Sequence, residues 1–115
     1  MIADTSVWID HLRRGNAHLA KALNLGTVLM HPFIVGELAC GNLRNREELL
    51  SLLQSLPPAP VADHDEALYL IDSEELHGRG IGWVDVHFLA SARLAGQQLW
   101  TLDRRLATIA SDLGL

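Results

Sequence analysis

The sequence opens with a short apolar run, an acid and a segment that suits a helix: Ile2-Ala3-Asp4-Thr5-Ser6-Val7-Trp8. Residues 1–3 have the composition of a short buried strand, and residues 5–12 place their apolar side chains on one helical stripe. Asp4 therefore stands where a strand ends and a helix begins. A strand that runs directly into a helix predicts the first unit of an α/β fold.

The same alternation continues along the chain. It predicts strands at residues 1–3, 27–30, 61–62 and 98–102. It predicts helices at residues 5–12, 17–23, 32–40, 46–55, 64–77, 85–95 and 104–110, with start signals at Asn16, Pro32 and Asp63. We therefore expect an α/β protein with a largely parallel sheet, and residues 1–115 as a single domain, because no linker or repeat interrupts the pattern.

Composition excludes several classes of protein. The 115 residues are 49% hydrophobic, which is enough for a packed core and too apolar for a disordered chain. Cys40 is the only cysteine, which excludes internal disulfides and cysteine-rich metal sites. Nine Lys and Arg against 14 Asp and Glu give a net charge of −5, so bulk charge alone does not attract nucleic acid. No apolar run reaches the roughly 18–20 residues of a membrane span, and no secretory signal opens the chain; we expect a cytoplasmic protein.

Two acids follow predicted strands. Asp4 comes after residues 1–3, and Asp103 comes after the apolar run 99–102. Ligands of open α/β sheets gather outside the carboxyl ends of the strands, so both acids are candidates for a binding site. The alternative is that both are helix N-caps, a position where Asp is common.

Two further acids interrupt apolar helices. Glu37 lies inside residues 33–40, where an unpaired buried carboxylate would cost several kcal/mol. A buried Glu37 therefore needs a partner that compensates its charge. The alternatives are a salt bridge to a neighbouring Arg and a position at an edge that is exposed to water. Asp85 opens the helix at 85–95 in line with the predicted buried stripe; the alternative is a first-turn acid that complements the helix dipole.

Together, Asp4, Glu37, Asp85 and Asp103 offer only oxygen ligands. Such ligands suit Mg²⁺ or Mn²⁺ much better than zinc, and these ions can activate water and polarise a phosphate. Hydrolysis of phosphodiesters is the reaction that this chemistry favours. Clustered carboxylates repel one another, so at least one of the four is expected to have a raised pKa.

At these positions the sequence resembles the PIN-domain ribonucleases, and among them the VapC-type toxins of bacterial toxin–antitoxin pairs. The matching residues occur in four stretches that span almost the whole chain in family order. These are Ile2-Ala3-Asp4-Thr5-Ser6-Val7-Trp8, Gly36-Glu37-Leu38, Val84-Asp85-Val86-His87-Phe88-Leu89-Ala90-Ser91-Ala92 and Thr101-Leu102-Asp103-Arg104-Arg105-Leu106.

The resemblance implies a three-layer α/β/α sandwich with a mostly parallel sheet of about four or five strands. It also implies an Mg²⁺- or Mn²⁺-dependent endoribonuclease that a cognate antitoxin neutralises. Carried over by residue, it makes the four acids the catalytic, metal-binding quartet. The hydroxyls beside that pocket would be Thr5, Ser6 and Thr101. Some relatives carry a further acid near the third motif, where Gly82-Trp83-Val84 supplies none.

Basic and aromatic residues give weaker signals. Arg104 and Arg105 follow Asp103 directly and are expected to contact RNA, with Arg13, Arg14 and Arg79 as an extension; the alternative is a set of solvated charges. The six histidines form no metal-binding motif, and the glycine-rich loop at residues 78–82 lacks the residues of a phosphate-binding loop. The three tryptophans are expected in the core or an interface rather than stacked on bases.

Two other functions remain open. A metal-dependent phosphohydrolase or phospho-receiver would also use an Asp at a strand end, but a receiver needs a late lysine and the only lysine is Lys21. Ser6 stands where a haloacid-type phosphatase needs a second Asp. A catalytically inactive PIN-like module that only binds a partner would have lost one of the four acids. Apolar helices around residues 49–53 and 68–76 also predict a homodimer.

Overall fold

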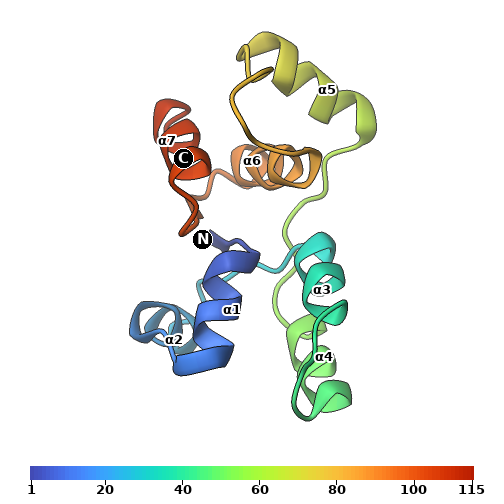
Figure 1. The fold of residues 1–115 in the computed structure, drawn as a ribbon, viewed down its shortest axis with the longest axis vertical. Coiled ribbons are helices and arrows are strands. Elements are labelled where there is room, and N and C mark those ends of the chain that lie inside the picture. Colours follow the sequence, from blue (N-terminus) through green and yellow to red (C-terminus); the bar gives the residue numbers. More distant parts are fainter.

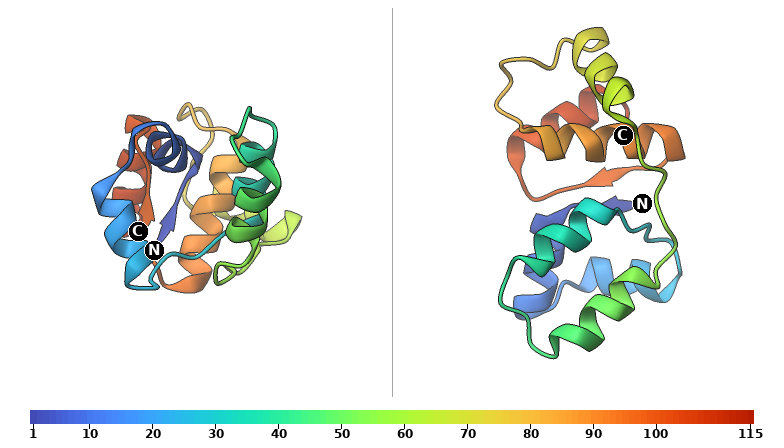
Figure 2. Two further views of the ribbon diagram at one scale, coloured as in Figure 1. Left: turned by 90° about the horizontal axis from the view of Figure 1, so that it is seen from below. Right: turned by 90° about the vertical axis from the view of Figure 1, so that its right-hand side faces the viewer.

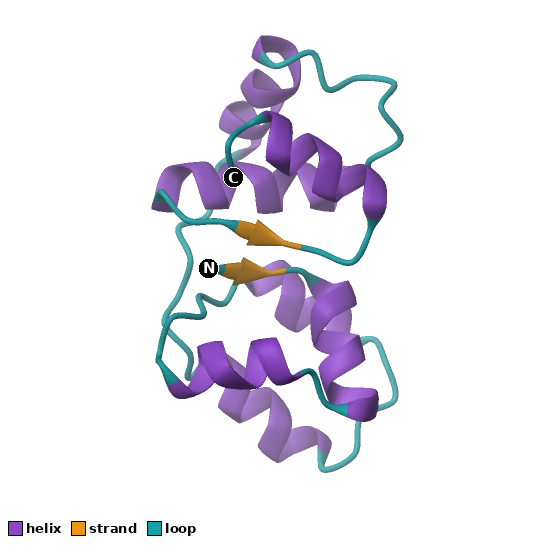
Figure 3. Ribbon diagram, turned by 90° about the vertical axis from the view of Figure 1, so that its left-hand side faces the viewer, coloured by secondary structure: helices purple, strands orange, loops and turns teal.

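The structure, a computed structural model, describes residues 1–115 as seven helices and two strands. In chain order they are β1 (Ile2–Ala3), α1 (Thr5–Arg14), α2 (Ala17–Asn24), α3 (Pro32–Ala39), α4 (Arg46–Gln54), α5 (His64–Ser73), α6 (Trp83–Ala95), β2 (Leu99–Trp100) and α7 (Arg104–Asp112). The strand pair lies between two groups of helices, α1–α4 on one side and α5–α7 on the other (Figure 1 and Figure 3). This is the mixed α/β arrangement that the sequence predicts.

The two strands join the beginning of the chain to its end. β1 and β2 are parallel, with Ile2 opposite Leu99 and Ala3 opposite Trp100. The two strands lie side by side in the middle of the molecule in Figure 2. Because parallel strands share their direction, the residues that follow β1 and β2 leave the same edge of the pair.

The sheet is smaller than the alternation predicts. Residues 27–30 and 61–62 form no strand; instead, single parallel bridges join Leu29 to Ile2 and Met30 to Pro58. The Met30 amide donates to Pro57 O at 2.8 Å, and Ala59 N donates to Met30 O at 2.8 Å. Pro57 and Pro58 have no N–H to donate, so this ladder cannot continue. The strand expected at residues 61–62 is wrong, and the one at 27–30 is reduced to bridges.

Local capping explains most of the helix starts. Asp4 accepts the Val7 N–H at 3.3 Å, and Asn16 accepts the Leu19 N–H at 3.0 Å. Asp63 forms the expected capping box: it accepts the Glu66 N–H at 2.7 Å, and the Glu66 side chain accepts the Asp63 N–H at 3.0 Å. These bonds satisfy amides that the first turn of a helix leaves without partners.

Several helix boundaries differ from the prediction by one or two residues, and the end of α5 differs by four. α5 ends at Ser73 rather than at residue 77, and Glu75 just beyond it has a φ of 52°, a left-handed conformation that stops a helix. α6 begins at Trp83, two residues before the predicted start at Asp85. Asp85 is therefore the third residue of its helix and not the first.

The buried apolar side chains form one cluster of 25 residues. β1 is completely buried, and α6 is buried over seven consecutive residues, Val86 to Ala92. A helix buried on nearly every side lies inside the layers rather than at the surface. No helix has the length and apolar character that crossing a membrane requires.

Candidate active site

Asp4 and Asp103 leave the same edge of the strand pair. Asp4 follows β1 and caps α1; Asp103 follows β2 and caps α7 through the Leu106 N–H at 3.0 Å. The Asp4 amide donates to Trp100 O at 2.9 Å, which continues the parallel pairing up to this edge. The N-cap alternative is thus confirmed for both acids. It does not compete with a shared site, because both caps stand side by side at the carboxyl ends of the strands.

Three donors hold the Asp4 carboxylate. Asp4 is only 5% exposed, and it accepts hydrogen bonds from the Ser6 hydroxyl, the Thr101 hydroxyl and the Val7 amide. Donors on both of its oxygens hold a carboxylate in one orientation. The fold has therefore already oriented the Asp4 side chain.

The same two hydroxyls connect the strand ends. Ser6 Oγ accepts the Leu102 N–H at 3.0 Å, and Thr101 Oγ1 accepts the Asp103 N–H at 3.0 Å. The two hydroxyl oxygens lie 3.4 Å apart. Ser6 and Thr101 thus fix the backbone before Asp103 as well as the side chain of Asp4.

Glu37 reaches this region from α3. The Thr5 hydroxyl donates to Glu37 Oε1 at 2.5 Å, which ties α3 to the first residue of α1. The expectation that Glu37 is buried is wrong, because Glu37 is exposed to solvent. The buried residues of this short helix are Ile34 and Leu38, so the apolar neighbours of Glu37 did not imply that Glu37 itself is buried.

Asp85 is the most perturbed of the four acids. It is half-buried and accepts the Gly82 N–H at 3.2 Å, so it also closes the first turn of α6. Burial raises the pKa of Asp85 above its ordinary value, and the hydrogen bond from Gly82 opposes this rise. The charges of Asp4, Asp103 and Glu37 raise the pKa further. The expectation of one carboxylate with a raised pKa is confirmed, and it identifies Asp85 as the acid that the other three repel.

The four acids share one electrostatic neighbourhood without closing into a coordination shell. No group of three His, Cys, Asp or Glu side chains lies close enough to hold a metal ion. Their donor atoms are nevertheless all carboxylate oxygens, and their mutual repulsion at Asp85 is the kind of imbalance that a divalent cation relieves. In chemistry and charge the residues fit Mg²⁺ or Mn²⁺.

The histidines play a structural part that the sequence did not specify. His31 is completely buried and caps α3 by accepting the Phe33 N–H at 2.9 Å. Burial, with a smaller contribution from His87, lowers the pKa of His31 to about 4. The pKa of His87 is also lowered, mainly by burial and to a smaller extent by the charge of His64. These two rings are therefore uncharged at neutral pH. The signal available in the sequence was His31 directly before Pro32, a helix-start position.

The predicted basic residues separate into two groups. Arg14 pairs with Asp10 at 2.5 Å and Arg79 pairs with Asp112 at 3.0 Å, whereas Arg104 and Arg105 have no acidic partner and are exposed. The Arg105 side chain lies so close to Gly80 that a Cβ there would come within 2.6 Å of Arg105 Nη1. The glycine-rich loop therefore makes room for Arg105 rather than forming a phosphate-binding loop.

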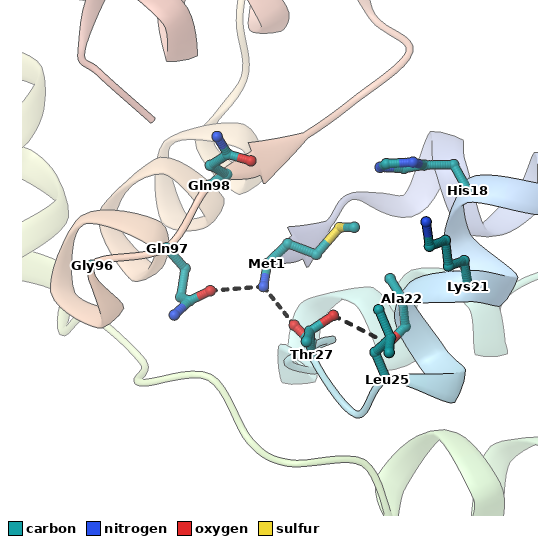
Figure 4. Close-up of a pocket in the computed structure, with 9 residues that line it drawn as sticks. All are labelled: Met1, His18, Lys21, Ala22, Leu25, Thr27, Gly96, Gln97 and Gln98. Atoms are coloured by element: carbon teal, nitrogen blue, oxygen red, sulfur yellow. Dashed lines mark hydrogen bonds between the residues drawn. The ribbon is translucent and has the colours of Figure 1, made fainter.

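Two cavities are relevant to the choice of site. One, of about 440 Å³, lies at the other end of the strands, beside Met1 and Gln98, which precede β1 and β2 (Figure 4). The Met1 ammonium there donates to Thr27 O at 2.6 Å and to Gln97 Oε1 at 2.8 Å. None of the four acids lines it. The other cavity, of about 520 Å³, is lined by Glu37 and thus adjoins the acids.

Comparison with known proteins identifies relatives of the chain. A family model described as "PIN domain" matches residues 1–112. The chain is 41% identical over 116 aligned positions to two curated relatives from two strains of Mycobacterium tuberculosis. Both relatives are named Ribonuclease VapC32. The alignment covers 100% of this chain and 94% of each relative.

Proposed function

The chain belongs to the PIN-domain family, and within it to the VapC-type ribonucleases, and from this premise we propose that it is a metal-dependent endoribonuclease toxin. It hydrolyses RNA, and a cognate antitoxin neutralises it. The observation that supports this proposal most directly is the pKa of Asp85, raised in part by Asp4, Asp103 and Glu37. It supports a site at which anionic groups from four separate parts of the chain gather around one place.

In this proposal, the residues that would hold Mg²⁺ or Mn²⁺ are Asp4, Glu37, Asp85 and Asp103. When bound, such a cation neutralises charge on a phosphodiester and lowers the pKa of water for attack. Ser6 and Thr101 orient the Asp4 carboxylate by donating to both of its oxygens. Thr5 positions Glu37 in the same way. These three hydroxyls are the auxiliary residues of the pocket.

The rest of the chain shapes the surroundings of the phosphate. Arg104 and Arg105 stand directly after Asp103, exposed and without acidic partners, where they can contact the RNA backbone. The neutral His31 and His87 add no positive charge. In this proposal the proton transfers of hydrolysis are assigned to water and the carboxylates, and no side chain acts as a nucleophile.

We also infer the architecture around this site. The bridges at Leu29 and Met30 extend β1 and β2 toward the larger parallel sheet of the three-layer α/β/α sandwich. The single buried cluster supports one domain over residues 1–115. Exposed apolar side chains on and before α5, Val61, Leu68 and Tyr69, support a homodimer. As an RNA-cleaving toxin, the protein is expected to act in the cytoplasm.

The decisive experiment is cleavage of a labelled RNA by the purified protein with Mg²⁺, with Mn²⁺ and with a chelator. We expect internal cleavage with either ion and none with the chelator. A phosphomonoester offered in parallel separates this function from a phosphohydrolase, which would release phosphate from it. Failure of the wild-type protein to cut RNA with either ion would contradict the proposal and favour an inactive partner-binding module.

A further inference from the structure

A groove of about 520 Å³ is lined by Glu37 and by residues of α1, α3, the loop between α3 and α4, and α4. Its apolar walls come from all three helices and the loop between α3 and α4: Ile9, Leu12, Leu38, Leu43 and Leu49. The two charged side chains besides Glu37 are both arginines, Arg13 from α1 and Arg44 from the loop. The volume lies within the roughly 300–1,000 Å³ range of small-molecule pockets.

The other arginines show why these two matter. Lys21 is the only lysine, so nine Lys and Arg leave eight arginines. Four of the eight are already engaged: Arg14, Arg79 and Arg93 form ion pairs at 2.5, 3.0 and 3.0 Å, and Arg46 donates to the carbonyl oxygens of Ala39 and Gly41. The remaining four have no hydrogen-bond or ion-pair partner in the protein.

The four free arginines form two pairs, and each pair lies beside one of the acids. Arg13 and Arg44 line the same groove as Glu37, and Arg104 and Arg105 follow Asp103 at the start of α7. A polyanion would be repelled by a protein of net charge −5 and by four clustered carboxylates. A chain of phosphates that passes the acids therefore needs nearby positive side chains without a protein partner, and these arginines supply them.

The walls of the groove suit a nucleotide. An RNA strand that is cut in its interior must continue on both sides of the broken bond, so nucleotides lie next to Glu37 as well as next to Asp103. Apolar side chains can accept the face of an unstacked base, and a guanidinium can stack on the base or bind its phosphate. The groove offers both kinds of interaction within one nucleotide's reach of Glu37.

Resting on the proposed ribonuclease function, we propose that the groove lined by Arg13 and Arg44 binds a nucleotide that flanks the cut phosphodiester. The RNA then crosses the acids between this groove on one side and Arg104 and Arg105 on the other. The groove contacts the base and its phosphate, so it contributes to the choice of cleavage site.

The test compares three proteins on one labelled single-stranded RNA that the wild type cleaves: wild type, the double variant Arg13→Gln/Arg44→Gln, and the single variant Arg14→Gln. Arg14 lies next to Arg13 on α1 but outside the groove, and its ion pair with Asp10 removes it from the expected RNA contacts, so its variant controls for loss of charge from this helix. In the double variant, the RNA concentration for half-maximal cleavage should rise by about tenfold for each arginine removed. The rate at saturating RNA should stay within about twofold, because neither arginine touches the reacting atoms. Circular dichroism checks that each variant is folded.

Direct binding gives a readout that does not depend on cleavage. Fluorescence anisotropy with the same RNA at several salt concentrations should show a weaker salt dependence for the double variant. The slope should decrease by about 0.7 for each phosphate that the two arginines neutralise in the wild type. The slope for Arg14→Gln should remain that of the wild type.

The outcomes separate this inference from the function it rests on. If the wild type cuts RNA and the double variant matches Arg14→Gln in half-saturation and salt slope, the groove proposal is wrong and the ribonuclease stands. If the wild type cuts no RNA, the ribonuclease fails first. If the double variant keeps RNA affinity but no longer binds the antitoxin, the groove is a protein-docking surface and our proposal is overturned.

Discussion

Thr101 and Asp4 are 97 positions apart in the sequence, yet the Thr101 hydroxyl donates a hydrogen bond to Asp4 Oδ2. The same oxygen of Thr101 accepts the Asp103 N–H at 3.0 Å. One side chain thus connects the acid after β1 with the acid after β2. The relative position of these two carboxylates depends on it.

The first prediction concerns this hydroxyl. Thr101→Val keeps the shape of the side chain but leaves the buried Asp4 carboxylate and the Asp103 amide each short of one partner. The free energy of unfolding should fall by about 1–3 kcal/mol, and RNA cleavage should fall with it. Urea denaturation measures the first effect. Thr108→Val, which removes an exposed hydroxyl bonded to Arg104 O, is the control and should change stability by less than about 0.5 kcal/mol.

A second prediction separates the two strand-end acids. Every group that contacts the Asp4 carboxylate donates a hydrogen bond to it. In Asp4→Asn one carboxylate oxygen becomes an NH2 group, which would face a hydroxyl donor and could not accept its hydrogen bond. We expect the free energy of unfolding to fall by about 1–3 kcal/mol. Asn is as good an N-cap as Asp, so Asp103→Asn should leave the stability of the metal-free protein within about 0.5 kcal/mol. Both variants should lose cleavage by on the order of 100-fold or more. Equal stability losses in the two variants would contradict the asymmetry.

Asp85 carries a prediction about pH and metal. Its pKa is raised by burial and then by the neighbouring acids, so ionising Asp85 destabilises the metal-free fold. The stability that protonated Asp85 contributes is present below its unfolded pKa and is lost as pH rises through its folded pKa. Asp85→Asn should therefore be more stable than the wild type at pH 7, and this advantage should shrink toward pH 4.

Added metal should reverse the order of these two proteins. Mn²⁺ that binds the folded wild type raises its melting temperature by mass action, whereas Asp85→Asn should respond weakly. A chelator should return the wild type to its metal-free melting temperature. A melting temperature of the wild type that ignores Mn²⁺ would contradict the proposed metal site.

His31 predicts the acid limb of the stability curve. Its pKa falls from 6.5 to about 4 on folding, so the unfolded chain binds its proton first as the pH drops. Stability should decline between about pH 6.5 and pH 4, by up to about 3 kcal/mol, and level off below. His31→Asn retains an acceptor for the Phe33 amide without titrating, and should remove most of that slope whatever its absolute stability. His77→Asn, at an exposed position, should keep the slope.

The homodimer can be tested at α5. Tyr69 is 72% exposed, so Tyr69→Glu should leave the fold intact while placing a charge in the expected interface. Sedimentation at micromolar concentration should find a wild-type dimer and a monomeric variant. Leu25→Glu, at 66% exposure on the far end of α2, should remain a dimer. A monomeric wild type would contradict the homodimer.

The sequence predicted much of this because the relevant signals are local. A capping residue such as Asn16 or Asp63 accepts hydrogen bonds from amides in the first turn of its own helix, and the helices begin directly after these residues. Asp4 and Asp103 were recognisable because each follows a short apolar run. The alternation of strands and helices then placed them at one edge.

The missed features depend on partners far away in the chain. Residues 27–30 look like a strand, but whether a ladder forms depends on Pro57 and Pro58, which have no N–H to offer. The exposure of Glu37 depends on how α3 packs. The hydrogen bonds of Ser6 and Thr101 to one carboxylate also need the folded chain, because no spacing in the sequence brings positions 6 and 101 together.

The pairing of β1 with β2 has a consequence for the synthesis of the protein. A ribosome that has already made Asp4, Glu37 and Asp85 has not yet made the strand that lies beside Asp4, nor the hydroxyl and the last carboxylate that follow it. The nascent polypeptide therefore lacks part of the proposed ribonuclease site during most of translation. That site is completed only when the segment around β2 has been synthesised and has paired with β1.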